Sequence, residues 1–176
     1  GTIPGIGNLM GMYADESLNW QVGSMAEQAF FTNALTPSDA AVQNLWNDSY
    51  KIIYQCNRII DGVAQSNAVT AASKDQLTGE ALFTRSFVHF YLVQLFGDVP
   101  YVTSTDYRVN KTVAKMPVGA MYTQLAKDLV QAGTLLENAA TLVNTRPSKY
   151  AVEALLARLY LYAEQYDKAL EYSNSV

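Results

Sequence analysis

The residues best suited to bind a ligand are concentrated between positions 12 and 20. This stretch holds the carboxylates of Asp15 and Glu16, the amide of Asn19 and two aromatic rings. Carboxylates and amides form hydrogen bonds with hydroxyl groups, and a flat ring packs against an apolar C–H surface. Asn33 adds an amide further along the chain. Acidic and aromatic residues together leave binding of a neutral ligand open.

The same residues do not predict a catalytic centre. Asp15 and Glu16 could act as acid and base on a glycoside, but that mechanism needs two carboxyl groups facing each other across a cleft. His89 is the only histidine and Cys56 the only cysteine, so the usual ligands of zinc and the usual partners of a nucleophile are missing. We expect no enzyme activity, no cofactor and no metal.

The composition limits the classes of protein that fit. The chain has 176 residues, 49% of them hydrophobic and 16% charged, which suits a single domain with a proper core. A net charge of −4 provides no concentrated basic face for nucleic acid. No segment approaches the roughly 18 apolar residues of a membrane span. The chain begins at Gly1 without an initiator methionine or a signal peptide, so we expect a processed or trimmed sequence.

Hydrophobic residues spaced by three and four positions predict a series of helices. Residues 1–35 and the stretch from Tyr101 to Met116 lack this periodicity, so we expect both to be irregular, and long loops are often functional. All five prolines fall in loops or at helix starts, which supports an all-α fold. The expected helices cover residues 36–62, 73–97, 117–138, 149–164 and 166 onward.

The helix ending near Gly97 is apolar on two faces and should lie inside the protein. Ser73 and Gln76 predict a capping box at its start. Gly97 predicts a left-handed C-terminal cap, and Pro100 prevents the helix from resuming.

Few polar residues interrupt this helix. Arg85 and His89 are four apart and therefore share one side. We expect His89 to be a core or interface residue, and Glu80 and Arg85 to form a structural pair. On the helix after Pro117, Asp128 is expected on the solvent-facing side, together with Lys127 and Gln131. Cys56 is expected to be a small buried side chain.

The last two helices match part of a tetratricopeptide repeat. Leu156, Ala157, Tyr160 and Ala169 fit its leucine, small, aromatic and alanine positions, whereas Ser173 replaces an expected aromatic residue. The other tyrosines at helical spacing, like Trp46, are expected in the core. The predicted fold class is thus all-α, with tetratricopeptide-repeat-like helical hairpins and long irregular loops.

The run GEALFTRSFVHFYLVQLFGDVPYV resembles the most recognisable segment of the SusD/RagB family. The family pattern is Gly-Glu-Ala, then an arginine within a helix, then Phe-Gly-Asp-Val-Pro. The matching residues here are 79–81, Arg85 and 96–100. Two flanking segments fit in the right order, so the resemblance extends from about Leu35 to Val176. Since family members are much longer, residues 1–176 would be the amino-terminal portion of such a protein.

The resemblance implies a surface-exposed outer-membrane lipoprotein of Bacteroidetes, attached through a lipid anchor that lies outside this chain. It would bind oligosaccharides and deliver them to a SusC-like TonB-dependent transporter. An alternative function is a tetratricopeptide-like scaffold that binds another protein without binding a glycan directly.

For a sugar ligand, the candidate contacts are Asp15, Asn19, Trp20 and Asn33. Trp20 would provide the ring, and the other three would provide hydrogen-bonding groups. An equally good interpretation is that Trp20 anchors its loop in the core. No family binding residue can be aligned with this segment.

Overall fold

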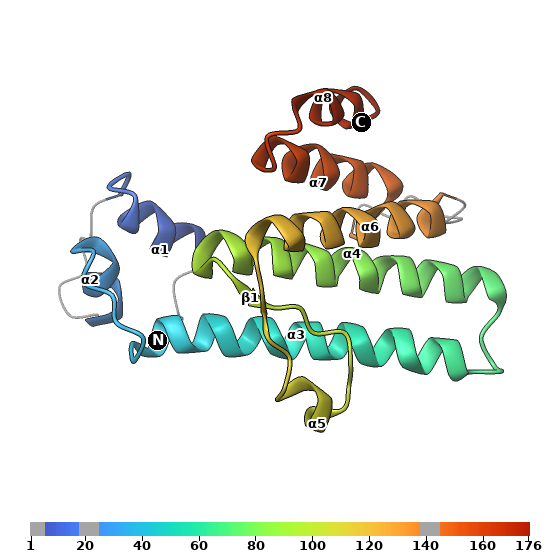
Figure 1. Ribbon diagram of the computed structural model, residues 1–176, viewed down its shortest axis with the longest axis horizontal. Coiled ribbons are helices and arrows are strands. Elements are labelled where there is room, and N and C mark those ends of the chain that lie inside the picture. Colours follow the sequence, from blue (N-terminus) through green and yellow to red (C-terminus); the bar gives the residue numbers. More distant parts are fainter. Residues whose placement is uncertain (1–5, 18–24, 138–144) are drawn as a thin grey trace. The chain divides into compact units, whose positions relative to one another are not determined.

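The protein is described here from a computed structural model that covers residues 6–17, 25–137 and 145–176. Most of these residues lie in helices, and the only strands among them are two residues long (Figure 1), which confirms the all-α prediction. The elements are α1 (Ile6–Tyr13), α2 (Met25–Phe31), α3 (Ala40–Gln65), α4 (Ala71–Phe96), β1 (Val99–Pro100), α5 (Tyr107–Asn110), β2 (Lys115–Met116), α6 (Val118–Leu136), α7 (Lys149–Tyr162) and α8 (Tyr166–Asn174).

The chain separates into two compact units, residues 1–48 and 49–176. In the first unit, α1 and α2 pack around a small core of Leu9, Met12 and Phe30. The prediction that residues 1–35 are irregular is therefore wrong for α1 and α2. Helices this short, in a segment rich in glycine, do not show a sustained apolar period.

In the second unit, α4 packs along α6, α6 along α7, and α7 along α8 (Figure 1). The side chains between these helices form the main core, which includes Phe90 and Leu92 of α4 and Leu125 and Leu129 of α6. Gly79 lets α4 approach α6 closely, since a Cβ atom there would lie 2.8 Å from Leu136 Cγ. The prediction that α4 lies inside the protein is confirmed.

Both ends of α4 differ in detail from the prediction. The helix begins at Ala71, and its cap is Thr70, whose side chain accepts a hydrogen bond from Ser73 N at 3.2 Å. The predicted capping box of Ser73 and Gln76 is therefore wrong. Gly97 has the expected positive φ of 69°, but its ψ of −129° lies outside the left-handed helical region.

The first long helix also starts later than predicted, because Thr36 does not cap it. Instead, Thr36 and Asp39 close a turn, in which the Thr36 hydroxyl donates to Asp39 Oδ2 at 3.1 Å. The helix α3 begins at Ala40. Cys56 and Ile53 are buried on its inner face, as predicted.

The stretch from Tyr101 to Met116 is more ordered than expected. Val99 pairs with Met116 and Pro100 with Lys115 in a short antiparallel ladder between β1 and β2. Helix α5 lies in the loop between them. Strands of two residues are too short to produce a detectable alternation in the sequence.

The hairpin of α7 and α8 follows the predicted repeat pattern. Leu156 and Tyr160 are buried, and the Tyr160 ring stacks on Tyr172 at 5.6 Å. Tyr172 directly precedes Ser173, the residue that departs from the repeat pattern, so an aromatic ring packs next to that position. By contrast, the expectation that tyrosines at helical spacing are buried is wrong for Tyr162 and several others, which are more than two-fifths exposed. These others are Tyr54, Tyr150 and Tyr166.

No helix in the described parts of the chain combines the length and apolar character needed to span a membrane.

Candidate functional site

Two of the predicted ligand-binding residues lie at the ends of short helices. Asp15 follows α1 and Asn33 follows α2, and both are exposed to solvent. Both have a positive φ, 59° at Asp15 and 53° at Asn33. Among residues other than glycine, aspartate and asparagine adopt this left-handed conformation most readily.

The backbone hydrogen bonds explain these two conformations. At the end of α1, Asp15 N donates to Met12 O at 3.3 Å and Glu16 N donates to Gly11 O at 2.8 Å. The end of α2 repeats the same pair of bonds around Asn33, at 3.2 and 2.9 Å. This is the Schellman pattern, in which a left-handed residue ends the helix. Asp15 and Asn33 thus have a structural role, while their side chains stay accessible.

Asn19 and Trp20 lie outside the described residues, so the predicted group of four is only partly located. The ring nearest to Asp15 in the described sequence is that of Tyr13, which is 47% exposed. Tyr13 packs edge-on against Phe30 of α2, with ring centroids 6.4 Å apart.

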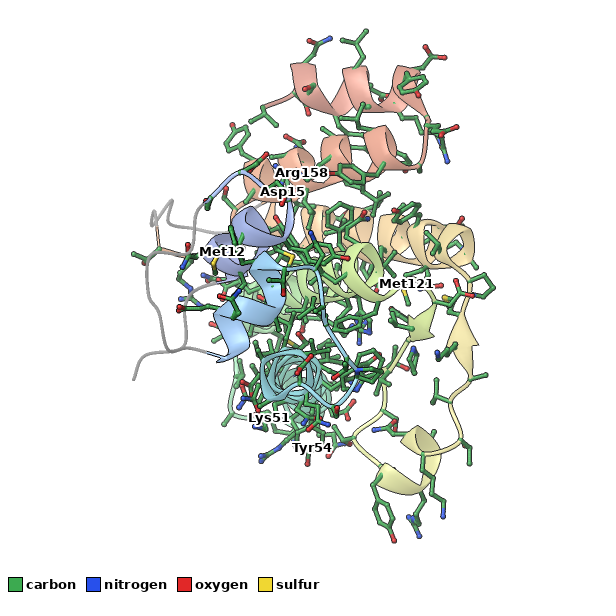
Figure 2. All side chains as sticks on the ribbon, turned by 90° about the vertical axis from the view of Figure 1, so that its left-hand side faces the viewer. Met12, Asp15, Lys51, Tyr54, Met121 and Arg158 are labelled. Atoms are coloured by element: carbon green, nitrogen blue, oxygen red, sulfur yellow. The ribbon has the colours of Figure 1, made fainter. Side chains whose placement is uncertain are left out.

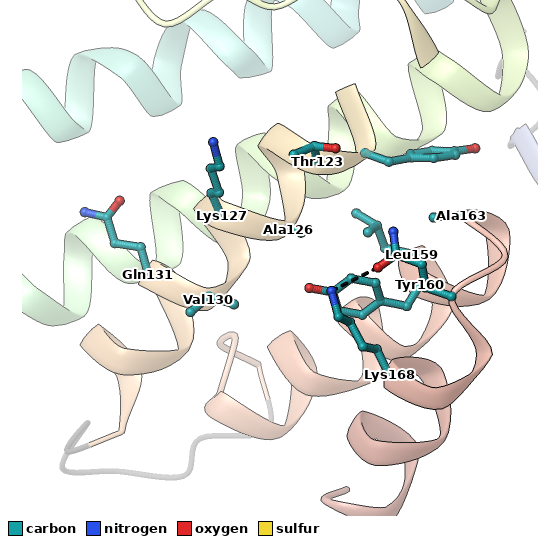
Figure 3. Close-up of a pocket in the computed structure, with 11 residues that line it drawn as sticks. Thr123, Ala126, Lys127, Val130, Gln131, Leu159, Tyr160, Ala163 and Lys168 are labelled. Carbon is teal, nitrogen blue, oxygen red and sulfur yellow. Dashed lines mark hydrogen bonds between the residues drawn. The ribbon is translucent and has the colours of Figure 1, made fainter. Parts of the chain in front are cut away.

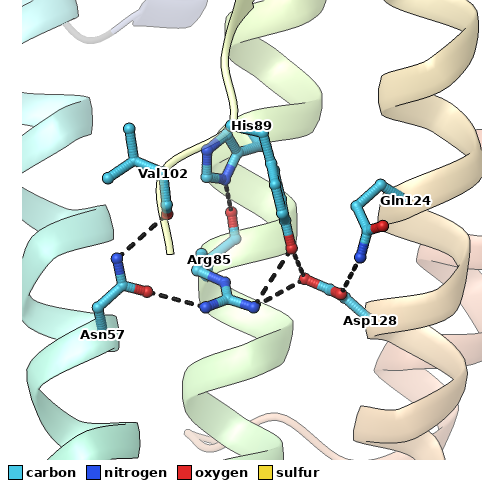
Figure 4. A network of polar contacts seen from close by, with 7 residues as sticks. Asn57, Arg85, His89, Val102, Gln124 and Asp128 are labelled. Atoms are coloured by element: carbon cyan, nitrogen blue, oxygen red, sulfur yellow. Dashed lines mark hydrogen bonds and ion pairs between the residues drawn. The ribbon is translucent and has the colours of Figure 1, made fainter. Parts of the chain in front are cut away.

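The most extensive polar cluster in the second unit is buried rather than open, and sequence reasoning did not anticipate it. Arg85 of α4 lies at its centre (Figure 4). The guanidinium donates to Asn57 Oδ1 of α3 at 2.8 Å and to Asp128 Oδ2 of α6 at 2.9 Å. Asp128 also accepts hydrogen bonds from the Tyr101 hydroxyl and from Gln124 Nε2. We call these five residues, together with His89, the Arg85 network.

The network corrects two predictions, one about the exposure of Asp128 and one about the partner of Arg85. Asp128 is only 6% exposed, so its placement on the solvent-facing side of its helix was wrong. Arg85 pairs with Asp128 rather than with Glu80, and Glu80 instead pairs with Arg146 at 2.7 Å. The ion pair across helices could not be read from spacing within one helix.

Within this network His89 is fully buried, as a core residue should be. Its Nδ1 lies 2.9 Å from the Arg85 carbonyl oxygen, which fits Nδ1–H donating to that oxygen. Burial lowers the pKa of His89 to about 4, and the nearby Arg85 charge acts in the same direction. The imidazole is therefore neutral at pH 7 and serves as a packed, hydrogen-bonded side chain.

The Arg85 network fixes the chain after the Phe-Gly-Asp-Val-Pro turn. Asn57 Nδ2 donates to Val102 O at 3.1 Å, and the Tyr101 hydroxyl is held between Arg85 and Asp128. Burial raises the pKa of Tyr101, so this hydroxyl remains a donor. Because Asn57, Arg85, His89 and Asp128 are buried, we assign the network a structural role.

An open groove lies over α6, α7 and the start of α8 (Figure 3). Its volume is about 480 Å³, within the range of small-ligand sites. Leu159 and two alanines give it a largely apolar floor. The side chains that line it are Tyr122, Thr123, Ala126, Lys127, Val130, Gln131, Leu159, Tyr160, Ala163, Gln165 and Lys168.

Lys168 and Gln165 are among the polar side chains that line this groove. Lys168 Nζ donates to Gln165 Oε1 at 3.0 Å and lies 5.0 Å from the centre of the Tyr160 ring. The Tyr160 ring already stacks on Tyr172 and so forms a wall of the groove. Among the described residues, no group of three or more histidine, cysteine, aspartate or glutamate side chains is arranged to hold a metal ion.

The described residues thus form an all-α fold whose closing hairpin of α7 and α8 follows a tetratricopeptide-like pattern. A sequence profile described as SusD-like, starch-binding and associating with the outer membrane matches residues 8–161. The chain therefore belongs to the SusD-like family, which confirms the resemblance of its central motif.

Individual relatives agree with this assignment. SusD-like protein P2 of Formosa agariphila is 30% identical over 136 residues, which cover 74% of this chain and 26% of that protein. A SusD-like protein of Bacteroides fragilis superposes with a TM-score of 0.74 and 25% identity, over 84% of this chain and 29% of that one. A laminarin-binding SusD-like protein shares the fold, with a TM-score of 0.74 and 24% identity over 82% and 32% of the two chains. The chain thus spans about a quarter of the length of the P2 relative.

Proposed function

We propose that this chain is the amino-terminal portion of a cell-surface lipoprotein that binds oligosaccharides and delivers them to a TonB-dependent transporter in the outer membrane. The observation that carries the proposal is the family match over residues 8–161, under a description that names starch binding and the outer membrane. The laminarin-binding relative of the same fold supports a glucan as one class of ligand. The role is binding without catalysis, and the lipid anchor would lie outside this chain.

The proposed sugar contacts remain Asp15, Asn19, Trp20 and Asn33. The exposed side chains of Asp15 and Asn33 support this assignment, because hydroxyl groups of a sugar can reach them. The Schellman turns fix the backbone from which the two side chains project. Exposed Tyr13 offers a further ring in the same segment.

Titration calorimetry of the full-length protein with starch- and laminarin-derived oligosaccharides tests the binding function. We expect heat of binding with at least one glycan. A full-length protein that binds no glycan in a broad panel, yet forms a tight complex with the transporter, would contradict glycan binding.

The contribution of the loop is tested by Trp20→Ala in the same full-length protein. A stacking ring contributes strongly to sugar affinity, so we expect clearly weaker binding. A Tyr150→Ala variant is the matched control, because Tyr150 is a half-exposed ring on α7. Unchanged affinity in Trp20→Ala would show that Trp20 only anchors its loop.

A protein-binding scaffold is the second candidate function, and one observation favours it. The closing hairpin exposes large apolar side chains that a partner surface could cover. These are Leu161, Tyr162, Tyr166 and Leu170, each more than half exposed. Glycan titration and transporter binding, measured on the same preparation, separate the two functions.

A further inference from the structure

The loop between β1 and β2 has a closed base and an exposed tip. The pairing of Val99 with Met116 and of Pro100 with Lys115 brings its two ends together. Helix α5 lies in the part of the loop farthest from this base (Figure 1). Compact loops whose ends meet are frequently functional.

The side of the loop next to β1 is fastened to the helices. Tyr50 of α3 donates from its hydroxyl to Pro100 O at 2.9 Å, and Asn57 donates to Val102 O at 3.1 Å. Tyr101 joins the Arg85 network, and Val102 is buried. Side chains from α3, α4 and α6 therefore hold three consecutive residues of the loop.

Further hydrogen bonds continue toward the tip. The Thr105 hydroxyl donates to Asp61 Oδ2 of α3 at 3.1 Å. Asn110 Nδ2 reaches back across the loop to Ser104 O at 2.8 Å. Near the base, Asp98 Oδ1 accepts a hydrogen bond from Val118 N at 3.0 Å. The backbone that carries α5 is thus held in one position without a core of its own.

The tip exposes apolar surface. Tyr107 is 74% exposed and Val109 is 50% exposed, and α5 buries none of its residues. Of the large hydrophobic side chains in the described ranges, Tyr107 is the most exposed. A tyrosine has only two side-chain torsions, so ordering it on binding costs little conformational entropy, and tyrosine is enriched among the residues that dominate binding energy.

The polar groups around Tyr107 favour a protein partner over a sugar. Asp106 accepts hydrogen bonds from Arg108 N and from the Arg108 guanidinium at 2.7 to 3.1 Å. Asn110 Nδ2 and the Thr112 hydroxyl donate to backbone carbonyl oxygens inside the loop. These bonds engage the Asp106 carboxylate and the donor groups of Asn110 and Thr112, so the tip offers chiefly an aromatic ring, a valine and the exposed Lys111 ammonium.

The charge of the tip indicates the character of its partner. Residues 105–116 contain one carboxylate, Asp106, and three cations, Arg108, Lys111 and Lys115. The stretch is net positive in a chain whose net charge is −4. A partner surface with carboxylates around an apolar depression complements both the charge and the exposed ring.

We propose that α5 is a docking tip, in which Tyr107 and Val109 enter an apolar pocket of a protein partner and Lys111 meets carboxylates at its rim. The inference rests on the proposed function, under which that partner is the TonB-dependent transporter. The Arg85 network and the bonds to α3 position the tip for this contact.

Binding of the full-length protein to its purified transporter in detergent tests the proposal. Tyr107→Ala should weaken the complex about tenfold or more, as expected for a buried aromatic anchor. Lys111→Glu should slow association by a similar factor at low salt. Tyr150→Ala on α7 is the control and should leave affinity unchanged. A photoreactive benzoylphenylalanine at position 107 should crosslink to the transporter.

The possible failures are distinguishable. A wild-type protein that forms no complex with the transporter would contradict the proposed partnership as well as the docking tip. A normal complex with the Tyr107→Ala variant, and no crosslink from position 107, would overturn the docking tip alone. Loss of oligosaccharide affinity in Tyr107→Ala, with the complex intact, would make the tip a sugar contact and would also overturn the proposal.

Discussion

Helix α6 places two neighbouring charged residues in opposite settings. Asp128 points into the Arg85 network, where it is 6% exposed and accepts hydrogen bonds from Arg85, Tyr101 and Gln124. Lys127, the preceding residue, is exposed and lines the open groove (Figure 3). Figure 2 labels another α6 residue, Met121, which is fully buried in the core.

The Arg85 network and the groove differ in whether a ligand or partner can reach their side chains. Charges in the network are paired and unreachable, so they stabilise and position the chain. Groups in the groove and the loops are reachable, so they can respond to a ligand or partner. Substitutions in the network should therefore change stability most, and substitutions in the groove should change it least.

The largest effect is expected for Asp128→Ala. This substitution leaves the Arg85 guanidinium buried without its charged partner, which costs about 3–5 kcal/mol of unfolding free energy. Urea denaturation followed by circular dichroism measures the change. Glu137→Ala is the matched control, since it removes a largely exposed pair with Lys149, and exposed ion pairs contribute little to stability. Equal losses of unfolding free energy in the two variants would show that the buried pair contributes no more to stability than the exposed one.

Acidification should weaken the fold through His89. The unfolded side chain takes up a proton near its ordinary pKa of 6.5, whereas the folded one resists until about pH 4. Stability from this residue is therefore complete above pH 6.5 and falls as the pH decreases toward 4, by roughly 3 kcal/mol. Denaturation midpoints measured at several pH values should fall less steeply with decreasing pH in His89→Asn than in the wild-type protein. Identical pH profiles would refute the assignment.

Gly79→Ala tests the close packing of α4 against α6 without changing the ion pair between Arg85 and Asp128. The added methyl group would lie 2.8 Å from Leu136 Cγ and 3.2 Å from Leu135 Cβ, and such crowding costs about 1–3 kcal/mol. Gly62→Ala in α3 is the control, because nothing lies within 4 Å of its added Cβ. That variant should be neutral or slightly more stable. A stable Gly79→Ala variant would mean that the helices are not in close contact there.

The smallest effect is expected for Lys127→Ala in the groove. An exposed side chain without a buried contact should change the unfolding free energy by no more than about 0.5 kcal/mol. The same urea titration measures it. A loss as large as that of Asp128→Ala would show that the groove, like the network, is part of the structural core.

Much of the second unit could be predicted from the sequence because its helices are long and periodic. The apolar stripes of α3 and α6 and the stop at Gly97 all identified real elements. Asp128 was misplaced because a single charged residue beside Lys127 looks solvent-facing in a helical pattern. Its partner Arg85 lies 43 positions away, and one sequence carries no signal that joins them.

The first unit was harder to predict for a physical reason. Helices α1 and α2 end at Asp15 and Asn33 in left-handed turns where glycine is the usual residue. Each helix is also too short for a hydrophobic stripe to repeat. The chemistry of Asp15 and Asn33 suggested ligand binding, while the turn geometry that positions them became visible only in the structure.

Hydrogen–deuterium exchange of the full-length protein, with and without its tightest-binding oligosaccharide, tests the central claim most directly. The claim is that loops bind the glycan while the Arg85 network holds the fold. We expect peptides from residues 13–35 to gain protection on binding and peptides from residues 85–93 to remain unchanged. Protection that appears at residues 85–93 and is absent from residues 13–35 would contradict the account.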